Sequence, residues 1–282
     1  MILKYGNQTV DFYTKIQSLI SISPYKQRAL TDVDYDDNGI PKQVVVSLSG
    51  GCDSASAFFL TAKYFPDIEI YPLTLRDVNA PKDADAAIEI SKFIKNRFPH
   101  SKINDIEVGS YNDLDPTTYH RAEKMIKSRD EYKSLNLVQM SKVNSIDDQN
   151  NAFMKKIGKP LRLDGMTANP PVKIRMGFAD KMRNYHWPKQ WGSFEIERVQ
   201  GEPRRDVFDK PELRYNVYQP FLNVNKRFVA GVFKEENLMK DLYPITRSCV
   251  GGKNQTNNFT EWCWQCFWCY EKDWAFNEVS DS

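Results

Sequence analysis

The stretch VVVSLSGGCDSASAFF, residues 44–59, decides the fold, because three β-branched valines lead into two adjacent glycines and then into small and apolar residues. The valines favour a buried strand, and the residues after the glycines favour a helix. Glycine has no Cβ, so a Gly-Gly junction lets the backbone approach a ligand closely. The N-terminus of the following helix adds free N–H groups and the positive end of its dipole. The stretch therefore predicts a phosphate-binding loop.

The side chains of this loop fit an anion and its counter-ion. Ser49 and Ser54 add hydroxyl donors, whereas the Asp53 carboxylate would repel a phosphate unless it caps the helix or faces a divalent cation. An ordinary strand-to-helix turn with an Asp or Ser cap has a similar composition. The loop follows the first predicted strand of a βαβ pattern, which favours the phosphate site. The motif is neither a Walker A loop nor G-x-G-x-x-G.

The rest of the chain alternates between predicted strands and helices. We expect strands at residues 43–48, 68–75, 102–108, 161–168 and 214–222, and helices at 53–64, 83–98 and 225–239, the last introduced by Asn225. This alternation predicts an α/β fold with a doubly wound, mostly parallel sheet of the HUP/Rossmann-like type. Such sheets bind ligands at the carboxyl ends of their strands.

The expected organisation is one large domain with additions. We assign residues 1–40 to an N-terminal extension, 41–245 to the core domain with a helical insertion at about 111–159, and 246–282 to a C-terminal metal-binding segment. The 282 residues carry a net charge of +2, which gives no argument for a nucleic acid or a membrane as partner. No signal-like segment or apolar run of about 20 residues is present, so we expect a soluble cytoplasmic protein.

Four of the five cysteines crowd the C-terminus with the spacing C-x13-C-x2-C-x2-C. Thiolates at the C-x2-C interval bind one tetrahedral ion from a single turn, and Cys249 can complete the shell through a Gly/Asn-rich loop. A four-thiolate zinc site has no open position, so the metal would be structural. An iron–sulfur cluster, or four free or disulfide-bonded cysteines, remain alternatives. Cys52 lies apart from the others, inside the glycine loop. A small buried side chain explains a cysteine at this position more simply than a nucleophilic role does.

The residues from Ser49 to Ser54 match the S-G-G-x-D-S pyrophosphate loop of the N-type ATP pyrophosphatases, and so resemble enzymes that cleave ATP between the α- and β-phosphates. With the C-terminal S-C-x-G…C-x-x-C-x-x-C pattern, the chain most resembles 7-cyano-7-deazaguanine synthase of the queuosine pathway. Two substrate-side segments of that family have no recognisable counterpart here. The resemblance therefore implies an ATP-dependent C–N ligase that adenylates 7-carboxy-7-deazaguanine or a related carboxylate, which ammonia then converts to an amide or nitrile.

The resemblance also implies site residues and cofactors. ATP and Mg2+ would be held by Ser47, Ser49, Gly50, Gly51, Asp53 and Ser54, with Leu73, Thr74 and Arg76 bordering the adenosine. The catalytic residues would be Asp53, Ser54 and Lys226, the last reaching a phosphate. A Zn2+ ion would be held by Cys249, Cys263, Cys266 and Cys269. The partners would be a small-molecule carboxylate and ammonia, with no membrane, and a homodimer is compatible with this reading.

Two other functions stay open. One is a sulfurtransferase that modifies tRNA, although it would need a sulfur-carrying cysteine and only Cys52 is available. The other is a non-catalytic zinc-knuckle protein that binds a nucleotide or a nucleic acid. A basic-aromatic stretch could serve either an anionic substrate or single-stranded nucleic acid, or be a solvated loop; it contains Lys173, Arg175, Lys181, Arg183, Tyr185, Trp187 and Trp191.

The remaining polar and aromatic residues have no clear catalytic or metal-binding pattern. Asp164 ends a predicted strand and is either a ligand-facing carboxylate or a turn residue. The three histidines His100, His120 and His186 have no ligand spacing. Packing around the metal explains Trp262, Trp264 and Trp268, which could also form the wall of a substrate pocket.

Overall fold

The computed structural model describes residues 1–13, 33–77, 81–110, 123–124, 148–158, 160–181, 212–214 and 217–277. Within these residues a six-stranded sheet has the order β5-β4-β3-β6-β8-β7. Its strands are β3 (Gln43–Ser47), β4 (Glu69–Arg76), β5 (Glu107–Ser110), β6 (Leu161–Leu163), β7 (Glu212–Arg214) and β8 (Val217–Gln219). All neighbouring pairs are parallel except β7 with β8. The predicted α/β fold with a doubly wound, mostly parallel sheet is confirmed.

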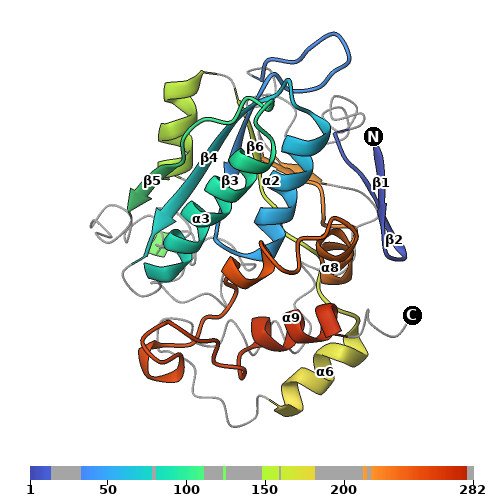
Figure 1. The fold of residues 1–282 in the computed structure, drawn as a ribbon, viewed down its shortest axis with the longest axis vertical. Helices are drawn as coiled ribbons and strands as arrows, with labels where there is room; N and C mark the ends of the chain where they lie inside the picture. Colours follow the sequence, from blue (N-terminus) through green and yellow to red (C-terminus); the bar gives the residue numbers. More distant parts are fainter. Residues whose placement is uncertain are drawn as a thin grey trace.

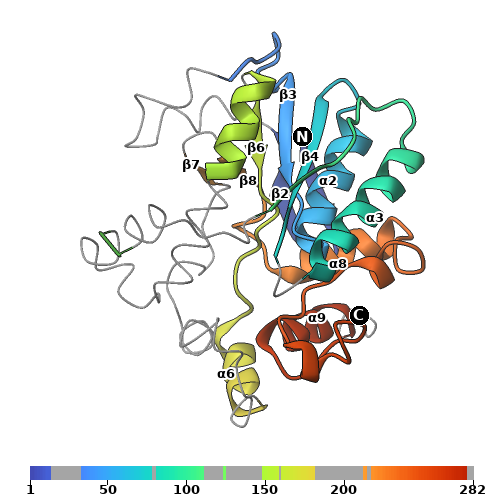
Figure 2. The same cartoon turned by 90° about the vertical axis from the view of Figure 1, so that its left-hand side faces the viewer.

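Helices cover both faces of the sheet, as expected for parallel strands. Helices α2 (Cys52–Tyr64) and α3 (Pro81–Arg97) lie on one face, and a helical segment at 148–157 lies on the other (Figure 2). The first two helices agree with the predicted ones to within two residues. Of the predicted insertion at 111–159, only 123–124 and 148–158 are among the described residues.

The three valines that open the deciding stretch show why this strand is central. Val44 and Val46 pack into the main core on the side of α2, whereas Val45 joins Leu73 and Met154 in a smaller cluster on the opposite face. Successive strand residues point to opposite faces, so a strand covered on both sides needs an unbroken apolar run. All three valines are fully buried.

The winding direction reverses between β3 and β6. From β3 the chain proceeds outward through β4 to β5, and it then returns to place β6 on the other side of β3. The loops that follow β3 and β6 therefore diverge at the carboxyl end of the sheet, where open α/β sheets form ligand crevices. Both the glycine loop and the segment after Leu163 lie at this end.

The C-terminal part of the chain lies beyond the same end of the sheet. Helix α8 (Lys226–Glu235) is capped by Asn225, whose side chain accepts a hydrogen bond from the Arg227 N–H at 3.0 Å. Figures 1 and 2 both place α9 (Phe267–Asn277) and α6 (Val172–Lys181) below the sheet. The predicted helix after Asn225 is confirmed, although it ends four residues earlier than expected.

An N-terminal hairpin was not predicted from the sequence, which placed the start of the regular core after residue 40. Strands β1 (Ile2–Tyr5) and β2 (Gln8–Asp11) pair antiparallel and lie against α8. Phe12 is fully buried, and the Tyr5 ring lies 5.5 Å from the Phe228 ring. The hairpin escaped prediction because its four-residue strands are too short for a clear alternation.

Three predicted strand boundaries were wrong. The strand expected at 102–108 starts at Glu107, and Ile103 forms only an isolated bridge with Ile70. The strand expected at 161–168 ends at Leu163, and the strand expected at 214–222 is β8 preceded by the antiparallel β7. Strand ends depend on neighbouring strands rather than on local pattern. No helix among the described residues is long and apolar enough to cross a membrane.

Candidate active site and metal centre

The glycine loop is fixed between helix α3 and the C-terminal segment. Gly50 has φ +81°, and a Cβ there would overlap the backbone carbonyl oxygen of Asp83 in the first turn of α3. The Gly50 carbonyl accepts a hydrogen bond from the Arg247 N–H at 2.7 Å. Only glycine satisfies both the left-handed backbone and this close approach. The left-handed backbone of Gly50 and its contact with the Asp83 carbonyl therefore explain why this turn contains a glycine.

The N-terminus of α2 has the features of an anion site. Gly51 occupies the N-cap position and provides no side-chain hydrogen bond to the amides of the first turn. The Ser49 and Ser54 hydroxyls lie 3.1 Å apart, and Ser54 Oγ also accepts from the Ser49 N–H at 3.2 Å. The first-turn N–H groups of a helix carry partial positive charge and bind phosphate readily. The residues present therefore fit a phosphate group.

Asp53 is held by residues from two other parts of the chain. Its Oδ2 lies 3.1 Å from Lys226 Nζ in α8, and it accepts a hydrogen bond from the Thr167 hydroxyl at 3.3 Å. Lys226 Nζ also lies 2.9 Å from Glu271 Oε2 in α9. Burial opposes the charge of Lys226, but the two carboxylates outweigh it and raise its pKa above the ordinary value. Lys226 is therefore a buried, paired cation beside the loop.

The segment after β6 comes unusually close to α2. A Cβ at Gly165 would overlap the backbone carbonyl of Asp53, so this glycine is required for the approach. The close contact brings Thr167 within reach of the Asp53 carboxylate. The segment after β6 thus contacts the helix that follows β3, at the end of the sheet where the winding direction reverses.

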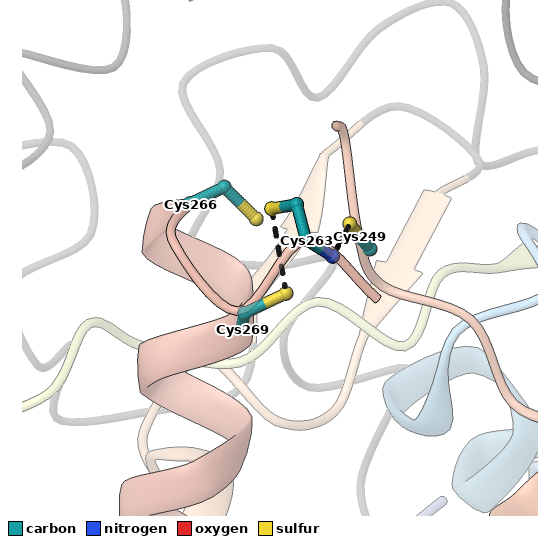
Figure 3. Close-up of side chains that lie close together, drawn as sticks. All are labelled: Cys249, Cys263, Cys266 and Cys269. Atoms are coloured by element: carbon teal, nitrogen blue, oxygen red, sulfur yellow. Dashed lines mark hydrogen bonds between the residues drawn. The ribbon is translucent and has the colours of Figure 1, made fainter. Parts of the chain in front are cut away.

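The four C-terminal cysteines converge on one point. Figure 3 shows their side chains turned toward one another, with Cys266 and Cys269 at the start of α9. All four sulfur atoms lie within 4.8 Å of one another, and Cys263 Sγ is 3.9 Å from Cys269 Sγ. A tetrahedral zinc ion with Zn–S bonds of about 2.3 Å requires sulfur separations of roughly 3.8 Å. The cluster therefore fits a four-thiolate metal such as zinc.

Backbone N–H groups donate hydrogen bonds to one sulfur atom of the cysteine cluster. The N–H groups of Gly251 and Cys263 donate to Cys249 Sγ at 3.3 Å and 3.2 Å. Such bonds favour the thiolate form that binds a metal. All four cysteine side chains are buried, which fits a structural role and leaves little room for a further ligand.

The cysteine cluster and the glycine loop are distant in the chain but adjacent in space. Arg247, which donates to the Gly50 carbonyl, stands two residues before Cys249. A Cβ at Gly51 would lie 3.3 Å from the Arg247 carbonyl oxygen. The residues just before the cysteine cluster therefore form one wall of the glycine loop.

Other predicted site residues lie nearby with partners of their own. The Ser47 hydroxyl donates to Asn150 Oδ1 at 3.2 Å and accepts from Arg162 Nε at 3.0 Å. Leu73 and Thr74 are buried within β4, and Arg76 at its carboxyl end forms an ion pair with Asp85 at 3.1 Å. Their contact with adenosine stays a prediction.

Some of the remaining candidate residues have surroundings that the structure shows, and the others are not among the described residues. Arg175 is 2% exposed, so it is not part of a solvated loop, and Lys181 lies 5.4 Å from the Tyr270 ring. Asp164 accepts from Arg162 at 3.0 Å. Lys173 and His100 are exposed. The described residues do not include Arg183, Tyr185, Trp187, Trp191, His120 or His186.

The aromatic residues between the cysteines have different surroundings. Trp262 lies under the ammonium of the buried Lys272, with 3.9 Å between Nζ and the ring centroid, and its ring is 4.9 Å from that of Trp264. Burial lowers the pKa of Lys272 to about 8. Trp264 is exposed. Trp262 thus packs around the cluster, which agrees with the structural explanation.

Several residues of the site were not predicted from the sequence. Thr167, Arg247 and Glu271 all contact the loop or Lys226, and none belongs to a recognisable motif. One signal was available for Glu271, because a Glu-Lys pair inside the aromatic stretch WCYEKDWAF suggests buried charges that need partners. Asn169 is buried, and within the described part of the chain neither polar atom of its amide has a hydrogen-bond partner.

One known protein family matches the part of the chain that contains the glycine loop. Residues 31–150, which contain β3, the glycine loop and α2, match the family model described as NAD synthase. Among solved structures, the chain is similar to NAD+ synthetase from Burkholderia pseudomallei, with 15% identity, a TM-score of 0.28, and coverage of 58% of this chain and 76% of that chain. No relative was found among curated proteins. The family match covers the region with the phosphate loop, and it supports the N-type ATP pyrophosphatase superfamily without selecting 7-cyano-7-deazaguanine synthase within it.

Proposed function

We propose that this protein is an ATP-dependent C–N ligase that activates a carboxylate as an acyl-adenylate and transfers the acyl group to ammonia. The observation that carries the proposal is the S-G-G-x-D-S loop at the N-terminus of α2, with the paired Lys226 beside it. The NAD synthase match supports the same type of reaction for the region around this loop.

The proposed reaction has two chemical steps. An oxygen of the substrate carboxylate attacks the α-phosphorus of ATP, the bond between that phosphorus and the α–β bridging oxygen breaks, and pyrophosphate leaves with the electron pair. Ammonia then attacks the acyl carbon and loses a proton, and AMP leaves with its oxygen. Both steps need charge neutralisation and alignment of the reacting atoms more than a strong base.

Each residue near the loop has a role suited to this chemistry. The amides of the loop and the first turn of α2 would bind the pyrophosphate portion of ATP, supported by the Ser49 and Ser54 hydroxyls. Asp53 would hold Mg2+, whose bound charge offsets that of the phosphates. Lys226 would supply a cation to the departing pyrophosphate.

The proposed substrate class is a small carboxylate, of which 7-carboxy-7-deazaguanine is the first candidate. Its support is the combination of the phosphate loop with a four-cysteine cluster, which the chain shares with 7-cyano-7-deazaguanine synthase by resemblance. In that case a second activation would convert the amide to the nitrile. Zinc would be the structural metal of the cluster.

The sulfurtransferase alternative is disfavoured by the surroundings of Cys52. This thiol is fully buried, and burial raises its pKa to about 11. The thiolate is the reactive form of cysteine, so such a group carries sulfur poorly at neutral pH. The other four cysteines are committed to the cluster.

The test is to incubate the purified protein with ATP, Mg2+, ammonium and single carboxylates, including 7-carboxy-7-deazaguanine. We expect AMP and pyrophosphate to form in equal amounts only with an accepted carboxylate. A matched reaction with Asp53→Asn should form both products at least about 100-fold more slowly. Release of ADP and phosphate, or no turnover with any carboxylate, would count against the proposal.

A further inference from the structure

Glu271 is the least expected participant in the site. It lies in α9, is 4% exposed, and places Oε2 at 2.9 Å from Lys226 Nζ. The same ammonium is 3.1 Å from Asp53 Oδ2. A single buried lysine thus joins the phosphate loop to a helix of the metal-binding segment.

The ion-pair group formed by Lys226, Asp53 and Glu271 contains more negative than positive charges. One ammonium faces two carboxylates, so the three ionised groups carry one excess negative charge in a largely buried place. Removing one partner from a buried ion pair is costly, whereas an ammonium with two carboxylates can release one and keep a partner. Asp53, with a 23% exposed side chain, is the carboxylate that can turn toward a ligand, because the Glu271 side chain is 5% exposed.

We propose that Glu271 is a positioning residue that holds Lys226 in place and charged while Asp53 binds Mg2+ of the nucleotide. The proposal rests on the proposed function, since it needs Mg2+ and ATP at the loop. Without the Glu271 carboxylate, Asp53 is the one carboxylate shown within ion-pair distance of Lys226 in the described part of the chain. Lys226 and Mg2+ would then compete for Asp53, and the magnesium nucleotide would bind more weakly.

The position of Glu271 also gives the cysteine cluster a second consequence. Cys266 and Cys269 fix the start of α9, and Glu271 follows Cys269 by two residues in the same helix. A metal bound to the cysteines would therefore fix the backbone that carries Glu271. Through Lys226, the metal-binding segment becomes part of the nucleotide site.

The test is isothermal titration of wild type, Glu271→Gln and Glu271→Asp with ATP in the presence and absence of Mg2+. We expect Glu271→Gln to bind MgATP at least about tenfold more weakly, the size expected for a lost hydrogen bond between charged groups. Glu271→Asp keeps the charge and should bind with an affinity between the two. Binding of ATP without Mg2+ should change by less than MgATP binding, because competition for Asp53 requires the metal.

The controls separate positioning from folding. Glu261→Gln removes an exposed carboxylate from the same C-terminal segment and should bind MgATP like wild type. Zinc content should be equal in all four proteins. Loss of zinc from Glu271→Gln, wild-type affinity in that variant, or an Asp variant as weak as the Gln variant would each overturn the inference.

The outcomes also distinguish the inference from the proposed function. If wild type itself binds no MgATP, the proposed function fails. If wild type binds MgATP and Glu271→Gln does so equally well, the function stands and only the role of Glu271 is wrong.

Discussion

Lys226 and Asp53 form an ion pair at the carboxyl end of the sheet, with 3.1 Å between Nζ and Oδ2. The pair joins the N-terminus of α8 to the N-terminus of α2, and the Thr167 hydroxyl approaches the same carboxylate oxygen. Parallel strands direct these helix N-termini to one edge of the sheet. The phosphate loop, the cation and the segment after β6 therefore meet at one place.

Replacement of Asp53 by Asn should abolish most turnover while the fold remains. Lys226 keeps Glu271 as a partner at 2.9 Å, so the buried charge stays paired. We expect carboxylate-dependent pyrophosphate release to fall by a factor of about 100 or more, a size typical of a lost charge-stabilising group. Thermal unfolding should show a melting temperature near that of wild type. A variant with full turnover would contradict the role of Asp53.

Replacement of Gly50 by Ala should disrupt the loop. The new Cβ would meet the Asp83 carbonyl, and φ +81° is unfavourable for alanine. We expect a loss of unfolding free energy of about 1–3 kcal/mol and loss of nucleotide binding. Gly177→Ala is the matched control, because a Cβ there has no neighbour within 4 Å and alanine favours helix α6. Urea unfolding and titration with MgATP measure both effects; equal behaviour of the two variants would be inconsistent with the described contacts.

Replacement of Cys266 by Ser should release the metal and destabilise the C-terminal segment. A structural four-thiolate site loses most of its affinity when one ligand is exchanged for a hydroxyl. Elemental analysis should find one zinc per wild-type chain and much less in the variant. Cys52→Ala, at a fully buried cysteine outside the cluster, should keep its metal. Iron in place of zinc in the wild type would show that the cluster holds a different metal.

The acid stability of the protein should depend on Glu236. Its carboxylate accepts hydrogen bonds from Lys63 and Tyr5, each at 2.6 Å. Burial raises the pKa of Glu236, but these hydrogen bonds outweigh it and leave the pKa below the ordinary value of 4.5. The stabilisation is therefore fully present above pH 4.5 and is lost as the pH falls through the lower folded-state pKa.

The measurement is urea unfolding of wild type and Glu236→Gln at several pH values. At pH 7 we expect the variant to be about 1–3 kcal/mol less stable, because a partly buried charged hydrogen-bond network is broken. The difference should narrow as the pH falls below 4.5. Glu89→Gln is the control, since its carboxylate is 56% exposed and its ion-pair partner in the described part of the chain is the exposed Lys92. This variant should change stability by under about 0.5 kcal/mol. A difference that is constant with pH would show that Glu236 acts through packing alone.

The sequence predicted those parts of the site whose chemistry is local. Two glycines between a valine-rich strand and a helix allow a close backbone approach, and Gly50 does lie against the backbone of Asp83 with a left-handed φ of +81°. Cysteines separated by two residues can direct their thiolates to one point, so the convergence of Cys263, Cys266 and Cys269 follows from spacing. Only the convergence of Cys249 on the others needed the fold to confirm it.

Boundaries and partners could not be predicted in the same way. Whether Leu163 ends a strand depends on where β8 stops pairing, and the N-terminal hairpin is held by its packing on α8. Glu271 illustrates the same limit for the site, because its charge is readable in the sequence but its partner is not.

The sequence by itself determined the glycine turn that follows the valine-rich strand and the close spacing of Cys263, Cys266 and Cys269, since both depend on residues within a few positions of one another. Tertiary structure alone decided that the two lie together. Arg247 reaches the Gly50 carbonyl, and Lys226 bridges Asp53 to Glu271, because the strands and helices bring segments distant in sequence to one end of the sheet. The strength of an ion pair or hydrogen bond depends on the distance between its atoms in space and does not depend on how far apart the two residues are in the sequence.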